Sequence, residues 1–202
     1  MESQHNKAVD SDSVITFWSG AKYPYCKMSN FFQVPVRYLD VDYPCSENAY
    51  QAQLFPNAID LFCCGGVLGS LTVEAFLFLG YSQQEADKKC KHWSKKNMVG
   101  ILTKMYAKRH VSIKKRISEQ ECKTIFLDIL YAKYTQNPEL SKLLISTGNK
   151  YLLEYDKGAN RIWLKDNKKV RWAGMIVDNK VVGDNQQGFL HMITRQILNG
   201  SY

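Results

Sequence analysis

The sequence lacks the cysteine and histidine spacings of common metal sites. Its six cysteines include no Cys-x-x-Cys pair, and its four histidines stand far apart along the chain. A zinc site needs ligands of these types a few residues apart, and a disulfide framework needs cysteines at paired spacings. We therefore expect no bound metal and no disulfide framework, and we interpret the cysteines as reduced thiols.

Glycine patterns that bind nucleotide phosphates are also missing. Gly65, Gly66 and Gly69 fit neither the Walker spacing nor the dinucleotide-binding spacing, and no Lys-Ser or Lys-Thr pair follows them. A helix end followed by a tight turn explains these glycines better. We expect no cofactor.

Long apolar runs are absent as well. The longest, from Val67 to Leu79, is too short to span a bilayer and contains Glu74, and no basic and then apolar leader opens the sequence. We expect a cytoplasmic protein, with the nucleus as the alternative, and no membrane partner. Residues 1–13 are polar and free of aromatics, which predicts a flexible tail, whereas residues 14–202 have the length and apolar content of a single domain.

Negative charge is scarce in one stretch of this chain, whose net charge is +8. Between Glu85 and Arg116, eleven lysines and arginines are accompanied by only two acids, Glu85 and Asp87. A surface of this sign attracts the phosphates of a nucleic acid or a small molecule, or it serves solubility. Apolar residues also recur at helical spacing from Ala86 to Met105, which predicts one long helix with a solvated basic face.

The remaining patterns predict a mainly α, α+β fold. Capping boxes beginning at Ser82 and Ser118 each start a helix, Asn137-Pro138 starts another, and residues 186–198 form a closing helix. Strand-like composition is found at residues 14–18, 34–39, 151–155 and 161–164, and in a hairpin over residues 175–182. We expect these strands to form a small antiparallel β-sheet.

The segment from Tyr43 to Phe55 carries the best candidate for chemistry. Ser46 is a favourable N-cap, Glu47 falls in the first helical turn, and Pro56 stops the helix. Glu47 and Gln51 then share one polar face. Most first-turn acids are capping or solvated carboxylates, so this pattern alone does not make Glu47 catalytic.

Residues 46–55 read Ser-Glu-Asn-Ala-Tyr-Gln-Ala-Gln-Leu-Phe. This segment resembles the Ser-Glu-His-x-x-Gln-Ala-x-Lys-Phe signature of the NADAR family of YbiA-like N-glycosidases. The resemblance spans most of the chain, because other segments match in order and spacing: Ile15–Trp18, Ser29–Phe32, Thr147-Gly148, Leu152, Glu154, Trp172-x-Gly174, Gly183-x-Asn185, Gly188, Met192 and Arg195. It implies a single NADAR domain with the YbiA-like helical fold.

The resemblance implies that Glu47 is the catalytic residue. Cleavage of an N-glycosidic bond needs a carboxyl group that stabilises the cation-like sugar carbon or protonates the departing nitrogen. The implied substrate-binding residues, which orient hydroxyls or phosphate or stack on a base, are Asn30, Phe31, Gln51, Trp172, Gly174 and Asn185. The site tryptophan could alternatively be Trp163.

Two residues depart from the family signature. Asn48 replaces its histidine, and Leu54 replaces its lysine. In members that remove ADP-ribose from guanine, a lysine is thought to attack the sugar carbon and form a Schiff base, which leucine cannot do. Lys95 and Lys96, near Trp93, are candidate replacements.

Three functions remain open. The first is an N-glycosidase acting on a phosphorylated ribosyl compound, either an ADP-ribose conjugate such as ADP-ribosylated guanine or a ribosylamino intermediate of riboflavin synthesis. The second is a catalytically impaired protein that binds ADP-ribose or an NAD derivative. The third is a basic nucleic-acid-binding protein. The expected partner is a nucleotide-like small molecule of the ADP-ribose type, or an ADP-ribosylated nucleic acid if the first and third functions combine.

Overall fold

A computed structural model describes residues 13–156 and 170–200. The chain divides into two compact units, residues 1–29 with 138–202 and residues 30–137, called here the terminal unit and the central unit. Of the helices described, none combines the length and the hydropathy needed to cross a membrane. The predicted strand at 161–164, the alternative site residue Trp163 and the predicted tail, apart from Ser13, lie outside the described residues.

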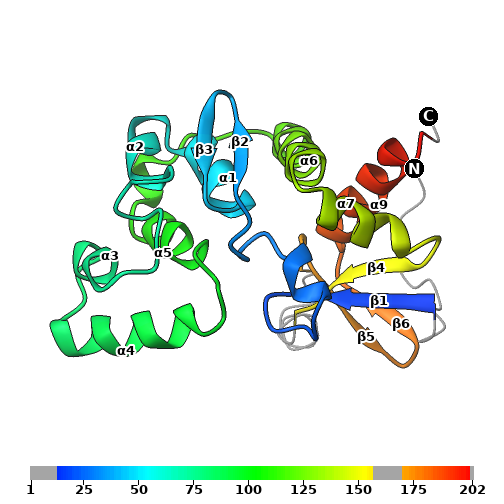
Figure 1. Cartoon of the computed structure of the whole chain (residues 1–202), viewed down its shortest axis with the longest axis horizontal. Helices are drawn as coiled ribbons and strands as arrows, with labels where there is room; N and C mark the ends of the chain where they lie inside the picture. The colour runs from blue at the N-terminus through cyan, green and yellow to red at the C-terminus, as the bar shows by residue number, and fades with distance from the viewer. Residues whose placement is uncertain (1–12, 157–169, 201–202) are drawn as a thin grey trace. The chain divides into compact units, whose positions relative to one another are not determined.

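The terminal unit is built around a parallel strand pair and a hairpin. β1 (Val14–Phe17) pairs in parallel with β4 (Tyr151–Glu154), and β5 (Met175–Val177) pairs antiparallel with β6 (Lys180–Val182). The hairpin turn uses Asp178 and Asn179, which both have positive φ, as a two-residue turn requires. Two α-helices, α7 (Pro138–Ser146) and α9 (Gln186–Leu198), pack against each other, and α9 also packs on β4 (Figure 1). A short 3-10 helix, η2 (Tyr25–Met28), completes the described elements of this unit.

The central unit is organised around α1 (Ser46–Leu54), which is buried along almost its whole length. α1 lies against α2 (Ile59–Phe62), α5 (Ile101–Arg109) and α6 (Glu119–Gln136). The other elements are β2 (Val36–Tyr38), β3 (Val41–Tyr43), η3 (Pro56–Ala58), α3 (Val73–Phe78), α4 (Gln83–Ser94) and η4 (Val111–Ile113).

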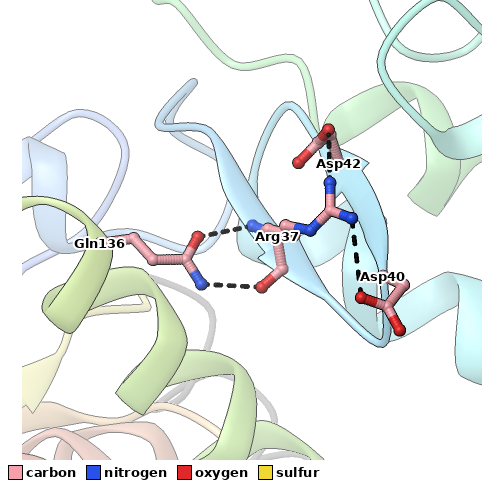
Figure 2. Close-up of polar contacts among 4 residues, drawn as sticks. All are labelled: Arg37, Asp40, Asp42 and Gln136. Atoms are coloured by element: carbon pink, nitrogen blue, oxygen red, sulfur yellow. Dashed lines mark hydrogen bonds and ion pairs between the residues drawn. The ribbon is translucent and has the colours of Figure 1, made fainter.

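A hairpin of β2 and β3 leads into the N-terminus of α1 and is anchored to α6. Gln136 accepts a hydrogen bond from the Arg37 backbone N–H at 2.7 Å and donates one to the Arg37 carbonyl at 2.8 Å (Figure 2). The Arg37 guanidinium forms ion pairs with Asp42 at 3.2 Å and Asp40 at 3.6 Å. The backbone of Arg37 therefore ties β2 to α6, and its side chain ties β2 to Asp40 and Asp42 of the hairpin that leads into α1.

The mainly helical α+β class is confirmed, and so are the capped helices, the closing helix and the hairpin. The strands in the described part of the chain form three two-stranded sheets, of which β1 with β4 is parallel and the other two are antiparallel. Residues 41–43, outside the predicted strands, pair with β2 as strand β3. Pairing between neighbouring segments was predictable from turn residues, whereas the pairing of distant strands depends on the whole fold.

The single long helix predicted across residues 86–105 is wrong. α4 ends at Ser94 and α5 begins at Ile101, with Asn97 in the left-handed region at φ 52°. Gly100 is the N-cap of α5 after this break. A Cβ at this position would lie 2.8 Å from the Glu47 Cβ and 3.0 Å from the Cys45 Sγ, so only glycine lets the start of α5 approach α1 this closely.

Candidate active site around Glu47

Glu47 lies in the first turn of α1 with its side chain buried, at 7% exposure. Its backbone N–H donates to the Asn30 carbonyl at 3.0 Å. Its carboxyl Oε1 accepts a hydrogen bond from the Gln51 Nε2 at 2.8 Å. The predicted shared face of Glu47 and Gln51 is therefore confirmed, and it faces the protein interior rather than solvent.

Ser46 does not cap α1, contrary to the prediction. The N-cap is Cys45, which has extended backbone geometry and makes no capping hydrogen bond through its side chain. The helix thus starts one residue earlier than the serine pattern indicated, and the Cys45 Sγ lies 3.1 Å from the Asn48 Oδ1 instead. The hydroxyl of Ser46 is left at the N-terminal end of α1 beside Glu47.

Three residues linked to Glu47 each have a buried side-chain oxygen without a hydrogen-bond partner among the described residues. These oxygens are the Asn30 Oδ1, the Ser46 Oγ and the Gln51 Oε1. Each belongs to a residue that is bonded to Glu47 or precedes it in the chain. Buried polar atoms are normally paired, so three such atoms on residues linked to Glu47 indicate a site that binds a polar ligand.

Burial and nearby lysines shift the pKa of Glu47 in opposite directions. Loss of hydration raises the pKa of the Glu47 carboxyl group, while Lys104, the Gln51 hydrogen bond and Lys114 oppose this change. The Lys104 side chain is exposed, and its Nζ lies 4.7 Å from the centroid of the Phe31 ring. The pKa of Glu47 is raised on balance, so the effect of burial outweighs the opposing effects of the lysines and the hydrogen bond.

Sequence reasoning missed these lysines. The lysines whose charges act on Glu47 are Lys104 and Lys114, whereas Lys96, one of the predicted replacements, has its Nζ 5.1 Å from the ring centroid of Trp93. Lys104 and Lys114 both lie beyond the helix break at residues 95–100, which was not predicted. The glycine within the predicted helix, Gly100, was the available signal.

The two departures from the family signature have structural roles. Asn48 donates hydrogen bonds to the carbonyls of Phe62, at 2.9 Å, and Leu68, at 3.1 Å, and so ties α1 to the segment after α2. Leu54 is 1% exposed and belongs to the core of the central unit. Neither side chain is placed to react with a ligand.

A buried lysine on α6 was also not foreseen. Lys133 is 1% exposed, and its charge partly offsets the burial that raises the pKa of the Cys45 thiol to about 12. Lysine side chains are almost never fully buried unless their charge is compensated. Lys133 therefore supplies a positive charge near Cys45, at the N-terminus of α1.

The other predicted site residues lie in the terminal unit. Asn185 is buried and left-handed at φ 46°; its Oδ1 accepts from the Glu154 N–H at 3.0 Å, and its Nδ2 donates to the Tyr151 hydroxyl and the Leu152 carbonyl. A Cβ on Gly174 would lie 2.7 Å from the Val182 carbonyl oxygen, so glycine permits close packing there. Trp172 is half-buried, and its carbonyl accepts from the Gln187 N–H at 3.1 Å. The roles of these residues in substrate binding stay predictions.

The predicted site residues thus form two groups. Asn30, Phe31, Glu47 and Gln51 come together in the central unit, and Trp172, Gly174 and Asn185 come together in the terminal unit. Across the described part of the chain, no cluster of three or more His, Cys, Asp or Glu side chains could hold a metal ion.

Comparison with solved structures defines the class of fold as mainly helical α+β. The E. coli protein YbiA, determined by NMR, has a similar structure, with a TM-score of 0.55 and 19% sequence identity over 98% of this chain and 92% of that chain. No family model matches the sequence, and no curated protein matches it. At this level of identity the similarity establishes the fold, and this chain has a YbiA-like α+β fold.

Proposed function

We propose that this protein is an N-glycosidase that hydrolyses the bond between a ribosyl group and a nitrogenous base in a phosphorylated substrate. The observation that carries the proposal is the buried carboxyl group of Glu47, whose neighbours Asn30, Ser46 and Gln51 each have a buried side-chain oxygen without a partner among the described residues. A buried acid with a perturbed pKa among convergent polar groups is typical of a catalytic site.

In this mechanism Glu47 acts first as the general acid. Its carboxyl group gives a proton to the departing nitrogen while the bond from that nitrogen to the sugar carbon breaks, and the bonding electrons leave with the base. A water molecule then adds its oxygen to the cation-like sugar carbon and returns a proton to the Glu47 carboxylate. Burial, which raises the pKa of Glu47, supports this role because the acid must hold its proton near neutral pH.

The neighbouring groups suit a phosphorylated ribosyl substrate. Acceptor oxygens of Asn30 and Gln51 can receive hydrogen bonds from sugar hydroxyls, the Phe31 ring can stack on a base, and Lys104 can pair with a phosphate. Substrate-binding roles for Trp172, Gly174 and Asn185 of the terminal unit are also proposed, because the resemblance implies them. The mechanism needs no amine nucleophile, so Leu54 is compatible with it.

Base release by the wild type and by Glu47→Gln tests the proposal. The panel contains ADP-ribosylated guanine in DNA, other ADP-ribose conjugates, NAD and ribosylamino-pyrimidines, and released base is measured by chromatography. We expect Glu47→Gln to lower the release rate by about a hundredfold or more while ligand affinity stays within a few-fold, because the glutamine can still accept the Gln51 hydrogen bond. The control, Glu74→Gln, removes an exposed carboxylate of α3 and should change nothing.

One observation favours a second candidate function, a protein that holds ADP-ribose or an NAD derivative without cleaving it. Leu54 stands where the family signature has its lysine, and it is buried in the core. Stoichiometric ligand retention by the wild type with no base released from any substrate on the panel would support this function and overturn the glycosidase proposal.

A further inference from the structure

The basic residues of α4, α5 and the segment after them are not neutralised within the molecule. Eleven lysines and arginines lie between residues 85 and 116, and none forms an ion pair with a carboxylate in the part of the chain that the structure describes. The acids within this stretch are engaged locally: Glu85 accepts two hydrogen bonds from Ser82, and Asp87 accepts one from Gln83. The charge is thus available to an external anion.

Folding brings two of these cations onto one aromatic ring. The Lys89 Nζ of α4 and the Arg109 Cζ of α5 each lie 4.5 Å from the centroid of Tyr81, in the link between α3 and α4. The Tyr81 hydroxyl also lies 3.8 Å from the Met105 Sδ, which fixes the ring against α5. Residues of α4 and of α5 thus both contact Tyr81, and α3 packs against α4 (Figure 1).

Aromatic and apolar groups accompany the charge. Lys96 lies 5.1 Å from the Trp93 ring centroid, and Phe78, three residues before Tyr81, is 50% exposed. Val111 and Ile113, which follow Arg109 in η4, are each 64% exposed. Cations close to half-buried and exposed aromatic rings fit single-stranded nucleic acid, because cations pair with its phosphates while unpaired bases stack on aromatic rings and guanidinium planes.

We propose that α4, α5 and residues 110–116 form a binding surface for single-stranded nucleic acid, centred on Tyr81, Lys89 and Arg109. The residues at its centre, Tyr81, Lys89 and Arg109, are not among the groups that act on Glu47, whereas Lys104 of α5 and Lys114 are. The test therefore substitutes the central residues, so that its outcome is separate from the glycosidase activity.

The test is fluorescence anisotropy with a labelled oligodeoxythymidylate of about 20 nucleotides, over about 0.05 to 0.2 M NaCl. We expect the affinity of the wild type to fall steeply with salt. The double variant Lys89→Gln/Arg109→Gln should bind at least about tenfold more weakly at low salt. In a plot of log affinity against log salt, its slope should be less steep by about 0.7 for each phosphate that the variant no longer neutralises. Tyr81→Leu should weaken binding by about tenfold, whereas Tyr81→Phe, which keeps the ring, should bind like the wild type.

The matched control is Lys142→Gln/Lys180→Gln, which removes the same charge from exposed positions of the terminal unit. Circular dichroism melting confirms that each variant is folded, and Glu47→Gln should bind the oligonucleotide like the wild type. The proposal is overturned by affinity that does not respond to salt, by an equal loss of affinity in the matched control, or by tighter binding to phosphatidylserine vesicles than to the oligonucleotide.

Discussion

Burial of Glu47 opposes the stability of the fold. A carboxyl group that leaves water loses the hydration of its charged form, and among the described side chains only Gln51 donates a hydrogen bond to it. Lys104 and Lys114 supply attraction without forming an ion pair at contact distance in the described structure. Buried ionisable groups with this little compensation are common in active sites, where they lower the stability of the folded protein.

Replacing Glu47 with glutamine should therefore stabilise the protein at pH 8 but not at acid pH. The pKa of Glu47 is raised in the folded state, so ionisation penalises the folded form. The penalty is absent below the ordinary carboxyl pKa, grows as the pH rises towards the raised value, and is constant above it. We expect Glu47→Gln to gain about 1 kcal/mol in free energy of unfolding at pH 8, measured with urea, with the pH-dependent part of this gain gone near about pH 4. An equal difference at both pH values would mean that burial does not raise the pKa of Glu47.

Local spacing predicted part of this site and could not predict the rest. The bond between Glu47 and Gln51 follows from their separation of one helical turn. The approach of Lys104 depends on where α5 begins, and the missing hydrogen-bond partners of the Asn30 and Gln51 oxygens depend on tertiary packing. These features arise between distant segments, for which a single sequence holds no direct signal.

At the scale of elements, α1 begins in a way that leaves a hydroxyl without a role in the fold. Cys45 occupies the N-cap, and the Ser46 Oγ is buried without a partner among the described residues. Stable helices normally use a serine at this end to satisfy a free backbone N–H. The buried Ser46 hydroxyl is therefore better explained as a ligand-binding group than as a helix cap.

Ser46→Ala distinguishes these two roles. Removal of an unpaired buried hydroxyl should leave stability unchanged or raise it by about 1 kcal/mol, whereas loss of a true N-cap would lower stability by about 1 kcal/mol. We also expect weaker binding of the substrates used to assay Glu47. Urea unfolding and ligand titration provide the measurements, with Ser118→Ala as the control, because Ser118 accepts a capping hydrogen bond from the Glu121 N–H at 3.2 Å. Destabilisation of both variants to the same extent would contradict the ligand-binding role of Ser46.

The helices were predictable where their ends are set by neighbouring residues. Capping boxes and the Asn-Pro pair placed α6 and α7 correctly, and the closing helix α9 has its predicted bounds. The failure lies in residues 95–100, where apolar spacing continues but the helix does not. There the close contact of Gly100 with Glu47 overrides the local pattern.

At the scale of the whole molecule, the sequence gives the net charge directly but does not predict which distant strands pair. The net charge of +8 and its concentration can be counted directly. The parallel pairing of β1 with β4 joins segments that lie far apart in the sequence, and no local pattern specifies that register. The gathering of Lys89 and Arg109 at Tyr81 likewise results from the fold.

Uncompensated charge of one sign should make the stability of this protein depend on salt. Cations that repel one another destabilise the compact state, and raising NaCl from about 0.1 M to about 1 M shortens the screening length from about 10 Å to about 3 Å. We expect the midpoint of thermal unfolding to rise with NaCl by about 2–4 °C for each kcal/mol of relieved repulsion. The rise should be smaller for Lys89→Gln/Arg109→Gln than for Lys142→Gln/Lys180→Gln, since Lys142 already has an ion-pair partner in Glu139 at 3.1 Å. Equal salt responses in the two double variants would show that the repulsion is spread over the whole surface and is not concentrated around Tyr81.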